Sequence, residues 1–167
     1  MTEAQEQATR CGFVALIGAP NAGKSTLLNQ LVGAKISIVS RKVQTTRTQV
    51  RGIVLAGATQ IIFVDTPGIF KPRRRLDRAM VTSAWGGAGD ADAVGLIVDV
   101  HKVSDEDTAL VLERVKDIRA PVFLILNKID TVPRESLLAV AGKLNEAHAF
   151  AATFMVSALT GDGVGEI

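Results

Sequence analysis

A glycine-containing run near the start of the chain has the composition of a phosphate-binding loop. Residues 18–25 read Gly-Ala-Pro-Asn-Ala-Gly-Lys-Ser and match the pattern G-x-x-x-x-G-K-[ST] at every fixed position. Glycines let successive backbone N–H groups point into one hollow, and the N-terminus of the following helix adds positive potential there. The Lys24 ammonium can reach the β and γ phosphates of a nucleotide, and the Ser25 hydroxyl is a hard oxygen ligand for Mg²⁺. The residues predicted to surround the phosphates are Gly18, Ala19, Pro20, Asn21, Ala22, Gly23, Lys24, Ser25 and Thr26.

A second candidate motif, Asp65-Thr66-Pro67-Gly68, follows an apolar run at residues 61–64. An aspartate at the end of a buried strand can hold Mg²⁺ through a water molecule. The Gly68 N–H can then meet the γ-phosphate. Taken alone, the same four residues are as typical of a Pro-Gly turn with a solvated aspartate.

A third motif can select the base. Asn127-Lys128-Ile129-Asp130 follows the apolar run 121–126. The Asp130 carboxylate can accept hydrogen bonds from N1–H and the exocyclic amine of guanine, whereas adenine presents an acceptor at N1 and lacks that amine. A site built on such pairing rejects the wrong base strongly. The Lys128 stem can lie along the base, and Asn127 can brace the surrounding loops.

A weaker signal follows residues 153–156, where Ser157, Ala158 and Leu159 form a fourth predicted loop. The Ala158 N–H can donate to the guanine carbonyl oxygen. All four candidate loops follow apolar strand-length runs, and ligands of open α/β sheets bind at the carboxyl ends of the strands. The combination predicts a guanine nucleotide site.

The elements that must position these loops alternate along the chain, which predicts an α/β fold of the P-loop NTPase type. We expect a mostly parallel six-stranded sheet with helices on both faces. Strands are expected at residues 13–17, 49–55, 60–64, 94–98, 121–126 and 153–156, the second and third forming one antiparallel edge pair. Helices are expected from the phosphate loop to about residue 32, at 74–84, at 105–118 with Ser104 as N-cap, and at 134–148.

The expected domain layout is a flexible N-terminus at residues 1–11 and a nucleotide-binding domain at 12–167. Residues 160–167 resemble a loop and the first turn of another helix, which a doubly wound sheet needs in order to cover its last strands. We therefore interpret the chain as part of a longer polypeptide.

Length and composition suit one compact domain of 167 residues, and the single cysteine excludes an internal disulfide. The sequence has neither a signal-peptide pattern nor an apolar run long enough to span a membrane. Its net charge is only +2, but ten of the nineteen basic residues lie in residues 35–51 and 71–78. These two segments predict a patch for an anionic partner, and a merely solvated surface is the alternative.

The stretches between the motifs resemble one particular family of GTPases. Residues 35–47 (Lys-Ile-Ser-Ile-Val-Ser-Arg-Lys-Val-Gln-Thr-Thr-Arg) and 64–72 (Val-Asp-Thr-Pro-Gly-Ile-Phe-Lys-Pro) resemble the Era family of bacterial ribosome-assembly GTPases, and the resemblance covers residues 12–165. It implies hydrolysis of GTP to GDP on Mg²⁺, and a role in assembly of the small (30S) ribosomal subunit and maturation of 16S rRNA. It also implies a C-terminal KH-type RNA-binding domain outside this chain, a cytoplasmic location and peripheral association with the inner membrane.

The resemblance also implies roles for particular residues. Thr46, rather than its neighbour Thr45, is expected to bind Mg²⁺ beside Ser25 and Asp65, with an exposed polar turn as the alternative. Asn21 is similar to an asparagine that holds K⁺ in relatives of this family, although an ordinary loop asparagine explains it equally well. The residues implied in catalysis are Lys24, Thr46, Gly68 and Asn21.

Ile69 follows the second motif, where many regulatory GTPases have a glutamine that orients water. An apolar side chain cannot do this by hydrogen bonds, so a slow intrinsic rate is expected. One rival interpretation is a tRNA-modification or tandem-domain ribosome-assembly GTPase of the same group. A second is a nucleotide-gated binding module with negligible turnover, and a third is an ATP-dependent P-loop kinase, against which Asp130 argues.

Overall fold

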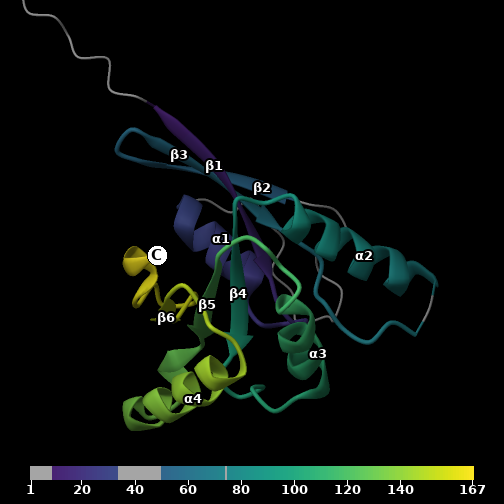
Figure 1. Ribbon diagram of the computed structural model, residues 1–167. Helices are drawn as coiled ribbons and strands as arrows, with labels where there is room; N and C mark the ends of the chain where they lie inside the picture. Colours follow the sequence, from purple (N-terminus) through teal and green to yellow (C-terminus); the bar gives the residue numbers. More distant parts are fainter. Residues whose placement is uncertain (1–8, 34–49, 74) are drawn as a thin grey trace, which may run out of the picture.

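The computed structural model describes residues 9–33, 50–73 and 75–167 (Figure 1). Ten helices and strands lie within these ranges, together with two short 3-10 turns. In chain order they are β1 (Arg10–Ile17), α1 (Lys24–Val32), β2 (Val50–Ala56), β3 (Thr59–Asp65), α2 (Arg75–Gly89), β4 (Ala93–Asp99), α3 (Glu106–Val115), β5 (Val122–Asn127), η1 (Ile129–Thr131), α4 (Arg134–Ala147), β6 (Thr153–Val156) and η2 (Val164–Glu166). The described part of the chain thus alternates strands and helices as the sequence predicts.

The strands form one six-stranded sheet in the order β2-β3-β1-β4-β5-β6. β2 pairs with β3 in antiparallel fashion, and the other four pairs are parallel. The prediction of a mostly parallel six-stranded sheet with one antiparallel edge pair is therefore confirmed. Since parallel strands end at the same edge, the loops after β1, β3, β5 and β6 lie along one edge of the sheet.

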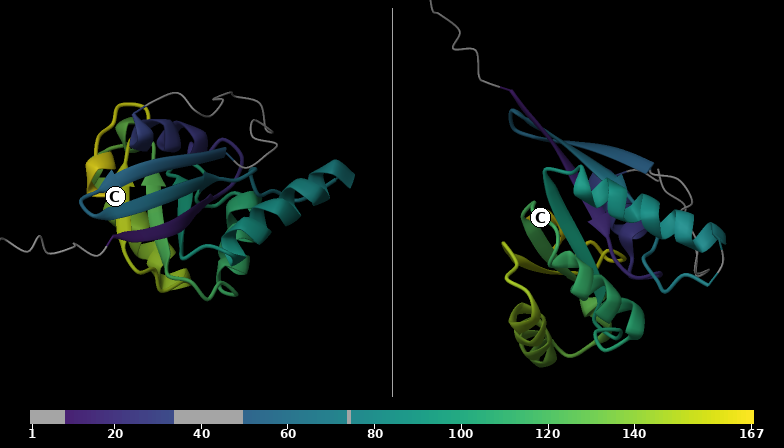
Figure 2. Two further views of the ribbon diagram at one scale, coloured as in Figure 1. Left: turned by 90° about the horizontal axis from the view of Figure 1, so that it is seen from above. Right: turned by 45° about the vertical axis from the view of Figure 1, so that its right-hand side comes forward.

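Helices cover both faces of the sheet, as predicted, but they cover the two faces unequally (Figure 2). Side chains alternate along β1, so Ala15 and Ile17 join a core beneath α2, α3 and α4, whereas Leu16 points the other way. On that second face Leu16 packs with Leu27 and Leu28 of α1. Among the described residues, α1 and the short η2 are the only helical elements of this second core.

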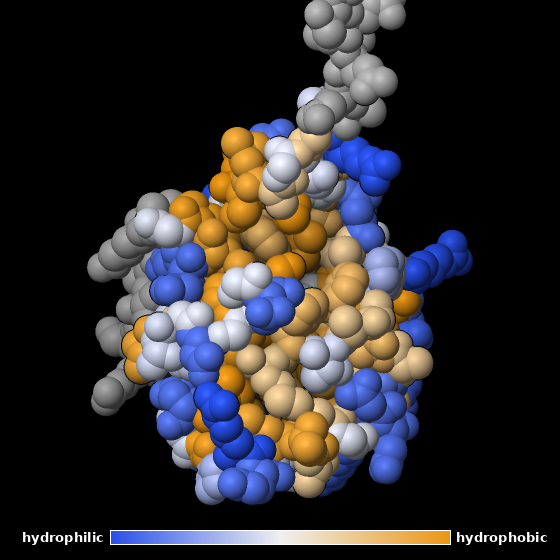
Figure 3. Space-filling view, turned by 90° about the vertical axis from the view of Figure 1, so that its left-hand side faces the viewer, coloured by the Kyte–Doolittle hydropathy of each residue, from blue (hydrophilic) through white to orange (hydrophobic). Residues whose placement is uncertain are grey.

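Beside α1 the second face holds an apolar groove of about 190 Å³. Five strands contribute to its walls, and the side of the molecule that carries the β2–β3 hairpin and η2 presents a wide apolar surface (Figure 3). The groove is lined by Val14, Leu16, Ile61, Phe63, Ala93, Gly95, Phe123, Ile125, Phe154 and Ile167. Phe123 and Phe154 pack at 6.2 Å between ring centroids. The groove therefore offers apolar surface that no described helix covers.

Helix α2 is longer than predicted. The sequence places its end at Ala84 because Gly86 and Gly87 disfavour helix, yet the helix continues to Gly89. Ala84 and Ala88 are 0% and 1% exposed in the core beneath the helix. Burial of one helical face offsets the low propensity of the glycines, so the predicted boundary is wrong.

α2 also carries the only tryptophan of the chain. Trp85 packs against the core, and the guanidinium of Arg114 from α3 lies 5.8 Å from the centroid of its ring. The buried indole N–H has no hydrogen-bond partner among the residues described. The cation–π contact fastens the C-terminal half of α2 to α3.

Other boundaries differ by smaller amounts. α3 begins at Glu106 with Asp105, not Ser104, at the N-cap, and the Asp105 carbonyl accepts the Ala109 N–H at 3.0 Å. Residues 160–167 form a loop and the 3-10 turn η2. In the described ranges we find no helix with the length and apolar character needed to cross a membrane.

Candidate functional site

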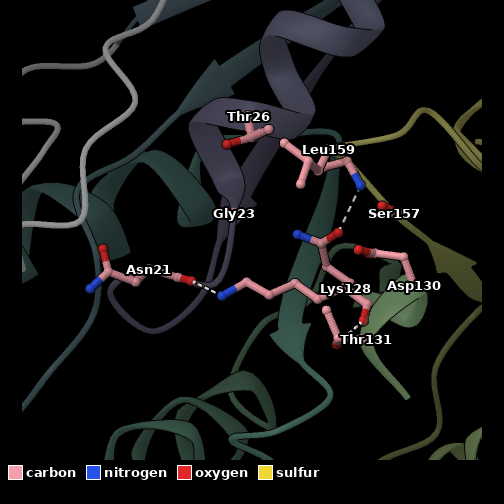
Figure 4. Close-up of a pocket in the computed structure, with 10 residues that line it drawn as sticks. Asn21, Gly23, Thr26, Lys128, Asp130, Thr131, Ser157 and Leu159 are labelled. Carbon is pink, nitrogen blue, oxygen red and sulfur yellow. Dashed lines mark hydrogen bonds between the residues drawn. The ribbon is translucent and has the colours of Figure 1, made fainter. Parts of the chain in front are cut away.

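Three loops meet around a cavity of about 680 Å³ at the carboxyl edge of the sheet (Figure 4). They are the loops that follow β1, β5 and β6, joined by the start of α1 and η1. The lining residues are Asn21, Gly23, Thr26, Asn127, Lys128, Asp130, Thr131, Ser157, Ala158 and Leu159. All of them except Thr131 are predicted from the sequence as nucleotide-binding residues.

Asn127 links all three loops. Its side-chain Nδ2 donates to the carbonyl of Ala22 at 2.8 Å, and its Oδ1 accepts the Ala158 N–H at 2.9 Å. The side chain is 2% exposed, so both hydrogen bonds are shielded from water. The predicted bracing role of Asn127 is confirmed. The Ala158 N–H, expected to meet the base, is engaged by Asn127 instead.

The Lys128 side chain crosses the cavity. It runs from the base-reading loop (residues 127–130) to the phosphate loop (residues 18–25). Its ammonium donates to the Asn21 carbonyl at 2.9 Å and lies 2.6 Å from the carboxylate Oδ2 of Asp99 (Figure 4 shows the first contact). Asn21 and Lys128 have φ of 60° and 70° and are the non-glycine residues with positive φ in the described ranges. Each backbone is thus held in a conformation that L-residues rarely adopt.

Lys24 lies under the phosphate loop with its side chain 6% exposed. The ammonium donates to the carbonyls of Gly18 and Ala19 at 3.2 and 2.9 Å. Burial lowers the pKa of Lys24 from 10.5 to about 8, while the negative charge of Asp65 works in the opposite direction. The Lys24 ammonium is thus incompletely solvated. A phosphate group bound beside it would stabilise its positive charge.

Ser25 and Asp65 come together at the expected metal position. The Ser25 hydroxyl donates to the Asp65 Oδ2 at 2.6 Å, and Asp65 is fully buried at the end of β3. A hydroxyl and a carboxylate are the hard oxygen donors that Mg²⁺ prefers, and Mg²⁺ commonly binds through one carboxylate together with phosphates and waters. The donor set fits the predicted ion. Thr46, the third predicted ligand, lies outside the described residues, as does Thr45.

The loop after β3 packs directly on the phosphate loop. The Ile69 N–H donates to the Gly18 carbonyl at 2.9 Å, and a Cβ on Gly68 would lie only 3.0–3.1 Å from atoms of Pro20. Similarly, Gly23 has φ of 100°, and a Cβ there would collide with the Asn127 amide. Gly23 is therefore required by its backbone conformation and by the Asn127 side chain, whereas a side chain at position 68 would need a small shift of Pro20.

Thr66 and Pro67 are predicted site residues that do not line the cavity. The Thr66 hydroxyl is buried and donates to the Leu16 carbonyl at 2.7 Å, which ties the loop to β1. Pro67 is also buried. Ile69 is 0% exposed and belongs to the core beneath α2 and α3. The apolar residue after the second motif is thus a packing residue in this arrangement.

The structure adds two residues that the sequence analysis missed. Asp99 ends β4 at the same edge of the sheet, and an aspartate directly after a buried apolar run was the available signal. Thr131 donates to the Lys128 carbonyl at 2.5 Å and lies 2.7 Å from the His101 Nε2. Its only signal was its position beside Asp130.

Comparisons with known proteins identify the family. The family model described as "50S ribosome-binding GTPase" matches residues 13–128. The chain is 59% identical over 165 residues to GTPase Era of Bradyrhizobium sp. strain ORS 278, covering 99% of this chain and 54% of the relative. It is 64% identical over 160 residues to GTPase Era of Mesorhizobium japonicum, covering 96% of this chain and 52% of the relative. The chain therefore spans about half the length of the curated relatives it matches.

Solved structures agree with these sequence matches. A crystal structure of Era in complex with MgGDPNP and nucleotides 1506–1542 of 16S ribosomal RNA superposes with a TM-score of 0.89 at 34% identity, covering 95% of this chain and 55% of that one. Aquifex aeolicus Era bound to GDP·AlF4⁻ gives a TM-score of 0.87 at 35% identity, with coverage of 95% and 55%. Together with the family model, these matches show that the chain belongs to the ribosome-binding GTPase family and is a GTPase domain of the Era type.

Proposed function

We propose that this chain binds GTP with Mg²⁺ and hydrolyses it to GDP and phosphate. The observation that carries the proposal is the direct linkage of the base-reading loop to the phosphate loop. Asn127 bonds the Ala22 carbonyl and Lys128 bonds the Asn21 carbonyl around one cavity. A site in which base and phosphate contacts support each other suits a nucleotide that spans both.

In this proposal Asp130 and Lys128 recognise guanine. Both line the cavity, and Asp130 is exposed to it at the start of η1. The carboxylate accepts from N1–H and the exocyclic amine, while the methylene stem of Lys128 lies along the base. Ser157, Ala158 and Leu159 close the opposite wall. Adenine would leave the carboxylate facing a lone pair, which favours GTP over ATP.

The phosphates occupy the hollow of residues 18–26, where Lys24 supplies positive charge. Ser25 and Asp65 hold Mg²⁺, which when bound neutralises charge on the phosphate oxygens. The Gly68 N–H meets the γ-phosphate, and Thr46 is expected to complete the metal ligands. Ile69 is buried and apolar, so it orients no water by hydrogen bonds. We assign to K⁺ held by Asn21 the separate role of a cation that stabilises charge on the phosphates in the transition state.

Single-turnover hydrolysis of GTP with Mg²⁺ and K⁺ tests the proposal. Conversion to GDP, with at least tenfold preference for GTP over ATP in a binding competition, is the expected result. Lys24→Ala should lower GDP affinity at least about tenfold, since a charge-assisted contact contributes about 1.5–3 kcal/mol. Nucleotide binding without turnover would instead support a nucleotide-gated binding module. Equal affinity for ATP would contradict the assignment of Asp130.

In the cell, we propose that the full-length protein acts in assembly of the small ribosomal subunit and binds 16S rRNA. The support is the Era crystal structure that contains a 16S rRNA segment, to which this chain is 34% identical over 95% of its length. The matching family model names the 50S subunit, whereas the solved Era structure contains a segment of 16S rRNA. The Era likeness over nearly the whole chain favours the small subunit over the tRNA-modification and tandem-domain alternatives.

We further propose that the domain continues into a helix and then a KH-type RNA-binding domain. The curated relatives are nearly twice as long as this chain, and the open groove beside α1 has the apolar lining that an amphipathic helix would cover. Adding the natural C-terminal sequence should raise the midpoint of thermal unfolding of this domain. Because ribosomal subunits are assembled in the cytoplasm, we place the protein there, and peripheral association with the inner membrane stays a prediction.

A further inference from the structure

We propose that Asp99 is a positioning residue that holds the Lys128 ammonium and, through it, the phosphate-loop backbone at Asn21. Asp99 belongs to none of the nucleotide-binding motifs and does not line the cavity. The inference rests on the proposed nucleotide-binding function, and it adds a residue that sets the geometry of the base-reading lysine.

The position of Asp99 is determined by the sheet. It is the last residue of β4 and pairs in register with Asn127, the last residue of β5. Its side chain is 4% exposed, and both carboxylate oxygens have partners. Oδ1 accepts the His101 N–H at 2.9 Å, and Oδ2 lies 2.6 Å from the Lys128 Nζ. The carboxylate therefore has one orientation, and that orientation points a buried negative charge at Lys128.

Lys128 transmits this constraint to the phosphate loop. Its ammonium is bonded to Asp99 and, at the same time, donates to the Asn21 carbonyl at 2.9 Å. Figure 4 shows the Lys128 side chain stretched toward the Asn21 carbonyl, while the Asn21 amide points away. Because both ends of the stem are held, its methylene groups form a fixed apolar surface along the cavity. Asn21 and Lys128 both have positive φ, which persists only where surrounding contacts hold it.

The Asp99 charge is needed for this arrangement for an electrostatic reason. Lys128 is 36% exposed, so its ammonium has an alternative partner in water. The buried carboxylate has no such alternative, and it holds the ammonium at the floor of the site. A neutral amide at position 99 could still accept the His101 N–H but would hold the ammonium more weakly. The Lys128 stem and the Asn21 carbonyl would then lose their fixed positions.

The test measures dissociation of GDP that carries a fluorescent methylanthraniloyl group on its ribose. Four forms of the protein are compared: wild type, Asp99→Asn, Lys128→Met and the double variant. Asp99→Asn should raise the dissociation rate about tenfold, the factor expected when a charge-assisted hydrogen bond is lost. Lys128→Met should raise it at least as much. In the Lys128→Met background, however, Asp99→Asn should leave the rate unchanged or lower it, because the buried carboxylate there lacks its cation.

Glu113→Gln is the matched control, since it removes one carboxylate charge from an exposed pair with Lys116 on α3. Its dissociation rate should equal that of wild type. Thermal unfolding without nucleotide shows whether each variant is folded. If wild type does not bind the fluorescent GDP, the proposed function itself is overturned. If wild type binds and Asp99→Asn matches it, or if the two substitutions add independently, the positioning role is overturned while the proposed function stands.

Discussion

The buried ammonium of Lys24 makes nucleotide binding depend on pH in a direction that the structure specifies. Burial lowers the pKa of Lys24 to about 8, and Asp65 opposes this only in part. Phosphate groups beside the ammonium should restore the charged form, so the pKa of Lys24 should rise when nucleotide binds. Binding near pH 8 must therefore be accompanied by uptake of a proton.

The size of the effect follows from the pKa of the free site. At pH 8 about half of the Lys24 side chains are deprotonated, so binding should take up about half a proton per nucleotide. Between pH 7.5 and 8.5 the affinity for GDP should fall about threefold, since the terminal phosphate, with a pKa of about 6, is already ionised throughout this range. Below pH 7 the contribution of Lys24 should be complete.

The stability of the nucleotide-free protein should change with pH in the opposite direction, increasing as the pH rises. Lys24 binds its proton more weakly in the folded chain than in the unfolded chain, where its pKa is near 10.5. Raising the pH from 8 toward 10.5 should therefore favour the folded state as far as Lys24 is concerned. Just above pH 8, the free energy of unfolding should thus rise with pH while the nucleotide affinity falls.

Titration calorimetry at pH 8 in two buffers of different ionisation enthalpy measures the proton uptake directly. Lys24→Gln, which removes the titrating group, should reduce the uptake nearly to zero. If wild type takes up less than about one tenth of a proton, or if Lys24→Gln takes up as much as wild type, the argument from burial is refuted.

Three further predictions concern the base, the monovalent ion and the basic surface. Asp130→Asn should weaken GDP binding at least about tenfold and favour xanthine nucleotides, which carry a carbonyl where guanine has its amine; unchanged GDP affinity in calorimetry would contradict it. Replacing K⁺ by Na⁺ should lower kcat with little change in affinity, and Asn21→Ala should remove the difference, whereas equal wild-type rates would leave Asn21 as a loop residue. Replacing the exposed Arg73, Arg75 and Arg78 by glutamine in the full-length protein should weaken binding to small-subunit particles and reduce the salt slope by about 3. If the variant binds with the same affinity and the same salt slope as wild type, these arginines form only a solvated surface.

The positions of the candidate loops could be predicted because each motif follows a run of buried strand residues. Parallel strands bring their carboxyl ends to one edge, so Lys24, Asp65 and Asn127 had to lie near one another once the sheet was expected. The antiparallel edge pair was also predictable from the short connection between β2 and β3. These predictions required only the alternation of elements and the motif spacing.

Contacts between distant side chains could not be predicted in this way. The bond from Lys128 to the Asn21 carbonyl joins residues 107 positions apart, and no local pattern encodes it. Asp99 was overlooked because an aspartate after a strand is common and its partner is visible only in three dimensions. The end of α2 could not be predicted because the low helix propensity of its glycines can be read from the local sequence. The burial of Ala88, which stabilises the last turns of the helix, depends on tertiary contacts.

The single tryptophan gives the molecule a built-in optical reporter. The chain has no tyrosine, so emission excited at the red edge of protein absorption comes from Trp85 alone. Its ring lies in the C-terminal half of α2, under the Arg114 guanidinium, and α2 begins seven residues after Gly68. A guanidinium over the indole and a buried N–H make the emission wavelength sensitive to small rotations of the helix. Any nucleotide-dependent movement of α2 can therefore be followed in the unlabelled protein.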